Sequence, residues 1–216
     1  MTQFIQLLLM ELRTEWRSGY ALSGIVLYVF STVFLVYSAS LEAQPKVWNT
    51  LFWIVMLFAS VNAVTKSFVR ESGRRELYYY TLTGPIPLLL AKLTYNVLLL
   101  TVLGLLTYAS FVAFLGNPVG NQNEFLLAIF LGSLGFGITF TFVSAIAGKA
   151  KNSATLTAIL GFPLVVPILL ELLKVSANAL RLVQDTDLTT DILILAGIDL
   201  LLLGLGILLF PFVWKD

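Results

Sequence analysis

Long apolar runs separated by short polar segments most strongly constrain what this 216-residue chain can fold into. Hydrophobic residues make up 58% of the sequence and charged residues only 12%, whereas about 25% of the residues in soluble domains are charged. Several runs reach the roughly 20 apolar residues that cross about 30 Å of hydrocarbon. They are unbroken, unlike the alternating strands of a membrane barrel. The sequence predicts an all-α polytopic membrane protein.

The apolar runs predict six transmembrane helices in a single transmembrane domain that covers residues 1–216. We expect the spans at about 20–38, 47–64, 88–114, 125–147, 154–173 and 192–213. No internal repeat or separate soluble domain is visible in the sequence. Trp48, Trp53 and Trp214 lie near predicted span ends, where tryptophan is enriched at the membrane interface. We therefore expect these three side chains in interfacial belts.

Residues 1–18 are too short and too charged to span a membrane. Their apolar residues recur at helical spacing, which predicts an amphipathic helix lying at the membrane interface. Glu11 falls within its mostly apolar stripe, whereas Arg13 and Arg17 are expected to face water or lipid phosphate. Contact with a protein partner is compatible with this interfacial placement.

The basic residues predict the orientation of the chain in the membrane. Six spans place both termini on one side, and that side would hold ten of the 13 basic residues. These ten are Arg13, Arg17, Lys66, Arg70, Arg74, Arg75, Lys92, Lys149, Lys151 and Lys215. The opposite side would hold Lys46, Lys174 and Arg181. Because cytoplasmic loops carry the excess of lysine and arginine, both termini are predicted to be cytoplasmic.

The segment 66–87 is the most strongly charged part of the chain between two predicted spans. Residues 74–82 favour a helix, a Ser72-Gly73 break precedes them, and the sequence Gly-Pro-Ile-Pro at 84–87 follows them. This pattern predicts a short cytoplasmic helix that lies parallel to the membrane between the second and third spans. We interpret it as a docking element for a soluble partner.

Several kinds of chemistry are excluded by what the sequence lacks. Without histidine or cysteine, the chain offers no HExxH zinc site, no histidine or cysteine catalytic pair and no disulfide. It also lacks the GxxxxGK[ST] loop that cradles the phosphates of ATP. We therefore expect no enzymatic activity, no directly bound metal or cofactor and no nucleic-acid partner.

Asp199 is the one clear acid inside a predicted span, and two interpretations of it stay open. An ionisable residue at this depth points to function because its burial is costly, which suggests a role with a proton or substrate. Alternatively, it lies near the outer end of its helix, where it reaches water and has only a structural role. Near the end of the preceding span, Glu171 and Lys174 are three residues apart and are expected to pair at the solvated rim.

Prolines and glycines mark two further helices. Pro163 and Pro167 remove backbone hydrogen bonds, so the fifth span is expected to kink or break. The kink would either allow a re-entrant or bent segment at the outer face or serve ordinary packing. In the fourth span, Gly132, Gly135 and Gly137 allow close approach of another helix.

The order of these features resembles the membrane subunit of a type-2 ABC exporter, and specifically the haem exporter protein B family of cytochrome c maturation. Three local patterns carry the resemblance. In the opening helix they are Glu11-Leu12-Arg13 and Arg17. In the central segment they are Phe68, Arg70-Glu71, Glu76-Leu77, Pro85, Pro87 and Ala91-Lys92. Further along they are Leu134-Gly135-Phe136, Lys149, Pro163 and Pro167.

The resemblance implies a non-catalytic permease subunit of the bacterial inner membrane, present in two copies. It implies that a separate ATPase subunit receives the segment 66–87 as a coupling helix, through Phe68, Arg70, Glu71, Arg74, Arg75, Glu76 and Leu77. Haem and ATP would be handled by partner subunits, including a haem-handling C subunit and a haem chaperone. The alternatives are an ABC permease for another lipophilic cargo and a non-transporting membrane scaffold.

Overall fold

The computed structural model describes residues 2–17, 20–39, 44–64, 84–147, 153–182 and 188–215. These residues form seven α-helices and contain no strand, which confirms the predicted all-α class. The helices are α1 (Thr2–Arg17), α2 (Tyr20–Ala39), α3 (Pro45–Val64), α6 (Pro85–Leu115), α7 (Gln122–Ala147), α8 (Ser153–Ala179) and α9 (Leu188–Lys215).

Five of the described helices are long and apolar enough to cross a membrane: α3, α6, α7 and most of α8 and α9. The helix α2 contributes a shorter apolar stretch, Ser23–Ala39. These lengths confirm a polytopic helical membrane protein. The predicted count of six spans stays a prediction.

Several helix boundaries differ from the sequence-based expectation. The helix α8 continues to Ala179, so Lys174 lies within a helix and not in the connection where we expected it. The helix α9 begins at Leu188, about one turn earlier than predicted. Both ends carry polar residues that hydropathy alone assigns to a loop, although they have helical backbone. The helix α6 likewise begins earlier than the predicted span, with Gly84 extended before the helix and Pro85 at its first position, where proline is favoured.

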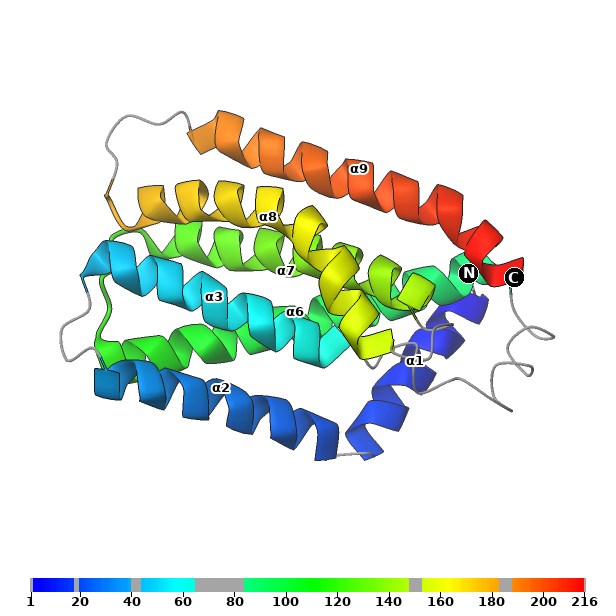
Figure 1. Cartoon of the computed structure of the whole chain (residues 1–216), viewed down its shortest axis with the longest axis horizontal. Coiled ribbons are helices and arrows are strands. Elements are labelled where there is room, and N and C mark those ends of the chain that lie inside the picture. Colours follow the sequence, from blue (N-terminus) through cyan, green and yellow to red (C-terminus); the bar gives the residue numbers. More distant parts are fainter. Residues whose placement is uncertain are drawn as a thin grey trace.

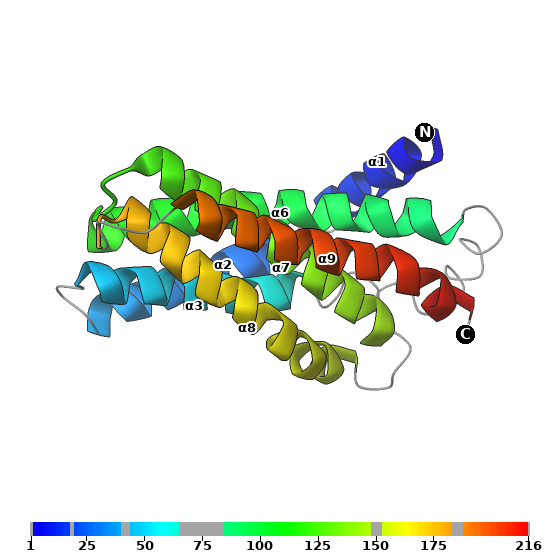
Figure 2. The same cartoon turned by 90° about the horizontal axis from the view of Figure 1, so that it is seen from above.

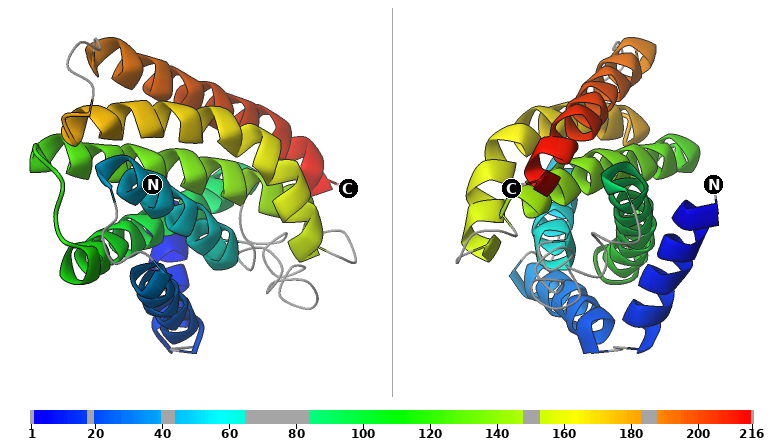
Figure 3. Two further views of the ribbon diagram at one scale, coloured as in Figure 1. Left: turned by 60° about the vertical axis from the view of Figure 1, so that its left-hand side comes forward. Right: turned by 90° about the vertical axis from the view of Figure 1, so that its right-hand side faces the viewer.

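The helix α7 lies at the centre of the bundle and contacts α3, α6, α8 and α9 (Figure 1). The helices α2 and α3 lie along one side, and α8 and α9 along the other (Figure 3). The short helix α1 leans away from the bundle but stays beside α6, as seen from above in Figure 2. Both termini lie at the same end of the molecule (Figure 1).

Three glycines of α7 allow three different helices to come close, which confirms the close approach predicted from sequence. A Cβ built on each glycine would lie within 2.7 Å of a side-chain atom on another helix. The partners are Trp53 of α3 for Gly132, Asp199 of α9 for Gly135 and Val97 of α6 for Gly137. Without a hydrophobic drive between helices in lipid, such close van der Waals contact is a main source of association.

The two tryptophans of α3 are buried in the core, so their predicted interfacial position is wrong. Trp48 stacks on Phe52 with ring centroids 5.8 Å apart, and both rings are almost fully buried. The indole Nε1 of Trp53 donates a hydrogen bond of 2.9 Å to the hydroxyl of Ser176 in α8. Because Ser176 satisfies this nitrogen, the ring does not need the interfacial water that usually holds tryptophan at a membrane surface.

The helix α8 runs unbroken through both of its prolines, Pro163 and Pro167. It bends in its first half, so its start points away from α9 (Figure 1). The predicted kink is therefore present, within a helix that is continuous from Ser153 to Ala179. Proline explains the bend because it lacks an N–H and its ring clashes with the preceding turn.

We expect Gly132→Ala to destabilise the protein, because the added Cβ would meet the ring of Trp53 at 2.6 Å. The hydrogen bond to Ser176 holds that ring in place, so we expect a loss of about 1–3 kcal/mol, as is usual for an overpacked core. Thermal unfolding in detergent, followed by tryptophan fluorescence, measures the change. Gly204→Ala is the control, since nothing lies within 4 Å of its added Cβ. Equal melting temperatures for the two variants would contradict the packing described here.

Candidate functional site

The candidate site lies where α1 crosses the first turns of α6. Leu7 of α1 packs against Leu88 and Ala91 of α6. Partly buried residues of α1, Phe4, Leu8 and Met10, surround this contact. The amphipathic helix predicted from sequence is therefore present, and its apolar stripe covers α6. This contact removes apolar surface of both helices from their surroundings, which favours the docked position of α1.

An ion pair lies next to this apolar contact and joins the same two helices. The Nζ of Lys92 donates a hydrogen bond to Oε1 of Glu11 over 2.8 Å. Only 1% of the Lys92 side chain and 15% of the Glu11 side chain are exposed. The sequence-based count placed Lys92 on the same side of the membrane as the cations of the loop, and the structure adds that its side chain is buried. Lys92 follows Leu88 by one helical turn, so α1 covers both side chains together.

A second ion pair, with the same distance between nitrogen and oxygen but a more exposed lysine, lies on α8. Lys174 donates a hydrogen bond to Glu171 over 2.8 Å, but its side chain is 55% exposed. The predicted pairing at the rim is thus confirmed. Exposed pairs of this kind contribute about 0–1 kcal/mol. Removing one partner of a buried pair costs about 3–5 kcal/mol, because it leaves a charge buried without compensation.

The ion pair lies close to the start of α6. Lys92 is about two turns, or roughly 10 Å, from Pro85, the first residue of this helix. The pair and the apolar contact therefore join α1 to the part of α6 that directly follows the central charged segment.

The other charged residues predicted for a site differ in how the structure places them. Arg13 is exposed on α1, away from the contact with α6. Arg17 ends α1, and its side chain is not among those described. The residues predicted to couple to an ATPase lie outside the described residues: Phe68, Arg70, Glu71, Arg74, Arg75, Glu76 and Leu77.

Asp199 lies deep in the bundle, on the face of α9 that packs against α7. Its side chain is 1% exposed, and one oxygen approaches the backbone of Gly135. Neither carboxyl oxygen has a hydrogen-bond partner among the described residues. The helix begins at Leu188, about three turns before Asp199, so the interpretation in which this side chain reaches water from the helix end is wrong.

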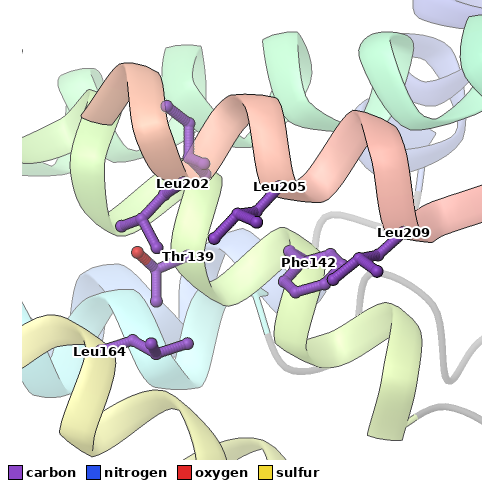
Figure 4. Close-up of a pocket in the computed structure, with 7 residues that line it drawn as sticks. Thr139, Phe142, Leu164, Leu202, Leu205 and Leu209 are labelled. Carbon is purple, nitrogen blue, oxygen red and sulfur yellow. The ribbon is translucent and has the colours of Figure 1, made fainter. Parts of the chain in front are cut away.

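A small cavity lies one turn further along α9, between α7, α8 and α9 (Figure 4). Its volume is about 70 Å³, well below the roughly 300 Å³ at which small-molecule sites begin. Its lining residues are Ile138, Thr139, Phe142, Leu164, Leu202, Leu205 and Leu209. The hydroxyl of Thr139, its one polar side-chain group, already donates to the carbonyl of Gly135. The described residues also contain no cluster of acids that could hold a metal ion.

The pairing of Lys92 with Glu11 was missed by sequence reasoning, although a signal for it existed. Lys92 interrupts the apolar run LLLAKLTYN, where a cation needs a partner. Glu11 interrupts the apolar stripe of residues 1–18 in the same way. Two opposite charges, each out of place on an apolar face, indicate that the faces meet.

We expect Lys92→Ala to release α1 from α6, whereas Lys174→Ala leaves the fold unchanged. The buried pair carries a desolvation penalty that the exposed pair lacks, so their losses should differ by about 2–5 kcal/mol. Because the chain has no cysteine, a single cysteine at Leu8 reports on the contact through its rate of thiol labelling. The double variant Glu11→Lys, Lys92→Glu keeps an ion pair with the two charges exchanged. We expect the cysteine in this variant to be labelled as slowly as in the chain with the original pair. Equal labelling rates for the two alanine variants would contradict the conclusion that the buried ion pair holds α1 on α6.

Comparison with known proteins places this arrangement in a family. The sequence profile of the CcmB protein family matches residues 2–213. Among curated proteins, no sequence matches the chain. The matched region contains α1, the ion pair and Asp199, and it extends over nearly all of α9. The chain therefore belongs to the CcmB protein family.

Proposed function

We propose that this chain is the permease subunit of an ABC transporter complex that acts in cytochrome c maturation. Membership of the CcmB family supports a membrane subunit of a haem-exporting ABC transporter. The long apolar helices support membrane insertion. The observation that carries the proposed coupling mechanism is the buried contact between α1 and α6. It connects an amphipathic helix to the helix that follows the charged central segment.

The proposed topology has six spans, with α2 as the sixth beside the five long apolar helices. The helix α2 has 20 residues and no charged side chain, which corresponds to about 30 Å of helix. Leu27 and Leu35 are exposed on its surface, as is expected of residues that face lipid. Both termini lie at one end of the bundle (Figure 1). The excess of basic residues predicted for that end supports a cytoplasmic position in the bacterial inner membrane.

The proposed coupling element is the segment 66–87, seated on the ATPase subunit. Its charged residues Arg70, Glu71, Arg74, Arg75 and Glu76 offer charge-assisted hydrogen bonds to such a partner. Since α6 begins at Pro85, movement of the segment acts directly on this helix. The ion pair between Lys92 and Glu11 would pass the same movement to α1.

Haem and ATP are, in this proposal, handled by partner subunits. The cavity between α7, α8 and α9 is too small for a haem, which supports a cargo path formed with a second copy or with a haem-handling C subunit. The coupling would drive one of two outputs, either export of haem or release of a haem-loaded chaperone. Membrane lipid would cover the exposed leucines of α2 and α9.

Co-purification from native membranes in mild detergent tests the assignment. Mass spectrometry identifies the partners, and an absorption spectrum detects haem. We expect an ABC ATPase together with haem-handling proteins. An ATPase without those proteins would indicate a transporter for another lipophilic cargo. Recovery without any ATPase would contradict the transporter and favour a membrane scaffold.

We expect Glu71→Arg or Arg74→Glu to abolish cytochrome c maturation while membrane insertion is unchanged. Reversing either charge replaces an attraction at the proposed ATPase contact with a repulsion. The measurement compares cytochrome c content with the ATPase activity of the purified complex. Lys46→Glu is the control, because Lys46 is exposed at the start of α3 and belongs to the predicted outer side. Normal cytochrome c content in both loop variants would contradict a coupling function.

A further inference from the structure

The buried carboxyl group of Asp199 is not used by the proposed coupling mechanism. It lies on α9 at the contact with α7, in a space that exists because residue 135 is a glycine. A Cβ at position 135 would lie 2.6 Å from Oδ1 of Asp199 and 2.9 Å from Ile168 of α8. Three helices therefore enclose the group, and both of its oxygens lack a hydrogen-bond partner among the described residues.

Among the side chains that the structure describes, no charge of the packed helices compensates this carboxyl group. These charged side chains are Lys92 of α6, Glu124 of α7, Glu171 and Lys174 of α8, and Asp191 of α9; the side chain of Lys215, at the far end of α9, is not among those described. Lys92 is bonded to Glu11, and Lys174 to Glu171. The remaining two are acids near the beginning of their helices. None of the five donates a hydrogen bond to Asp199.

An ionised carboxylate without a partner is highly unfavourable at this depth, whereas the neutral acid is tolerated. We propose that Asp199 is a proton-binding site, which keeps its proton while α9 is packed on Gly135 and releases it when α9 moves away from α7. Because separation lets water reach the group, take up its proton and hydrate the carboxylate, rising pH favours the separated arrangement. Protonation of Asp199 thus stabilises the arrangement in which α9 is packed on α7.

The packing of α9 is incomplete beside Asp199. A cavity of about 70 Å³ begins one turn from this residue, where α9 meets α7 and α8. Leu202, Leu205 and Leu209 of α9 line it, opposite Phe142 of α7 (Figure 4). The helix α9 is also the least buried of the five candidate spans. The contact between α9 and α7 is therefore easier to separate than a contact made by a helix that is enclosed on all sides.

Infrared spectroscopy of the purified chain in lipid tests the protonation directly. At neutral pH we expect the carbonyl stretching band of a protonated carboxylic acid, and its loss in Asp199→Asn. Asparagine retains the shape of the neutral acid, so this variant should fold. Gly135→Ala should shift the band, because its Cβ enters the space of the carboxyl group. Gly197→Ala is the matched control on α9, with nothing within 4 Å of its Cβ. Identical spectra for wild type and Asp199→Asn would overturn the proposal.

A distance measurement tests the release of the proton. Two exposed residues, Phe130 of α7 and Leu201 of α9, are replaced by cysteine and spin-labelled. The chain has no cysteine of its own that would also react. We expect the population with longer distances to increase from pH 6 to pH 9. In Asp199→Asn, which has no proton to release, this population should stay constant. A distance distribution independent of pH in the wild type would overturn the proposed link between the proton and helix packing. Neither measurement requires an ATPase, so a failure here is distinct from a failure of the proposed function.

Discussion

Close packing on the glycines of α7 is the contact on which the rest of the bundle depends. Gly132, Gly135 and Gly137 lie within two turns of one helix, and each admits a side chain from a different neighbour. Lipid solvates a leucine as well as another helix does, so association in a membrane relies on this intimate contact. The central position of α7, and through it the placement of α3, α6 and α9, follows from these three positions.

Polar groups add specificity to this packing in two different ways. Some are satisfied between helices, such as Trp53 with Ser176 and Lys92 with Glu11. Each of these pairs fixes one helix against another, because separation would leave a donor or a charge without its partner. Asp199 is different, since packing leaves its carboxyl group without a partner. The satisfied pairs stabilise their helix contacts, whereas the unsatisfied carboxyl group of Asp199 makes the contact between α7 and α9 sensitive to pH.

Local features of the sequence were sufficient for part of this structure. Hydropathy predicts the helical membrane class, the spacing of apolar residues predicts α1, and the three-residue separation predicts the pair of Glu171 and Lys174. The burial of Trp48 and Trp53 could not be predicted, because it depends on which helices meet. The pairing of Lys92 joins positions 81 residues apart. Each of the two charges interrupts an apolar pattern, but nothing local to either residue identifies the other as its partner. The coupling residues between 66 and 83 stay a prediction from charge and resemblance.

The separation of Glu11 and Lys92 in the sequence has a consequence for biogenesis. During synthesis, α1, α2 and α3 leave the ribosome before any part of α6 exists. The carboxylate that pairs with Lys92 is therefore present in the chain before the lysine itself is made. When α6 is inserted, the counter-ion of its buried cation comes from the same chain.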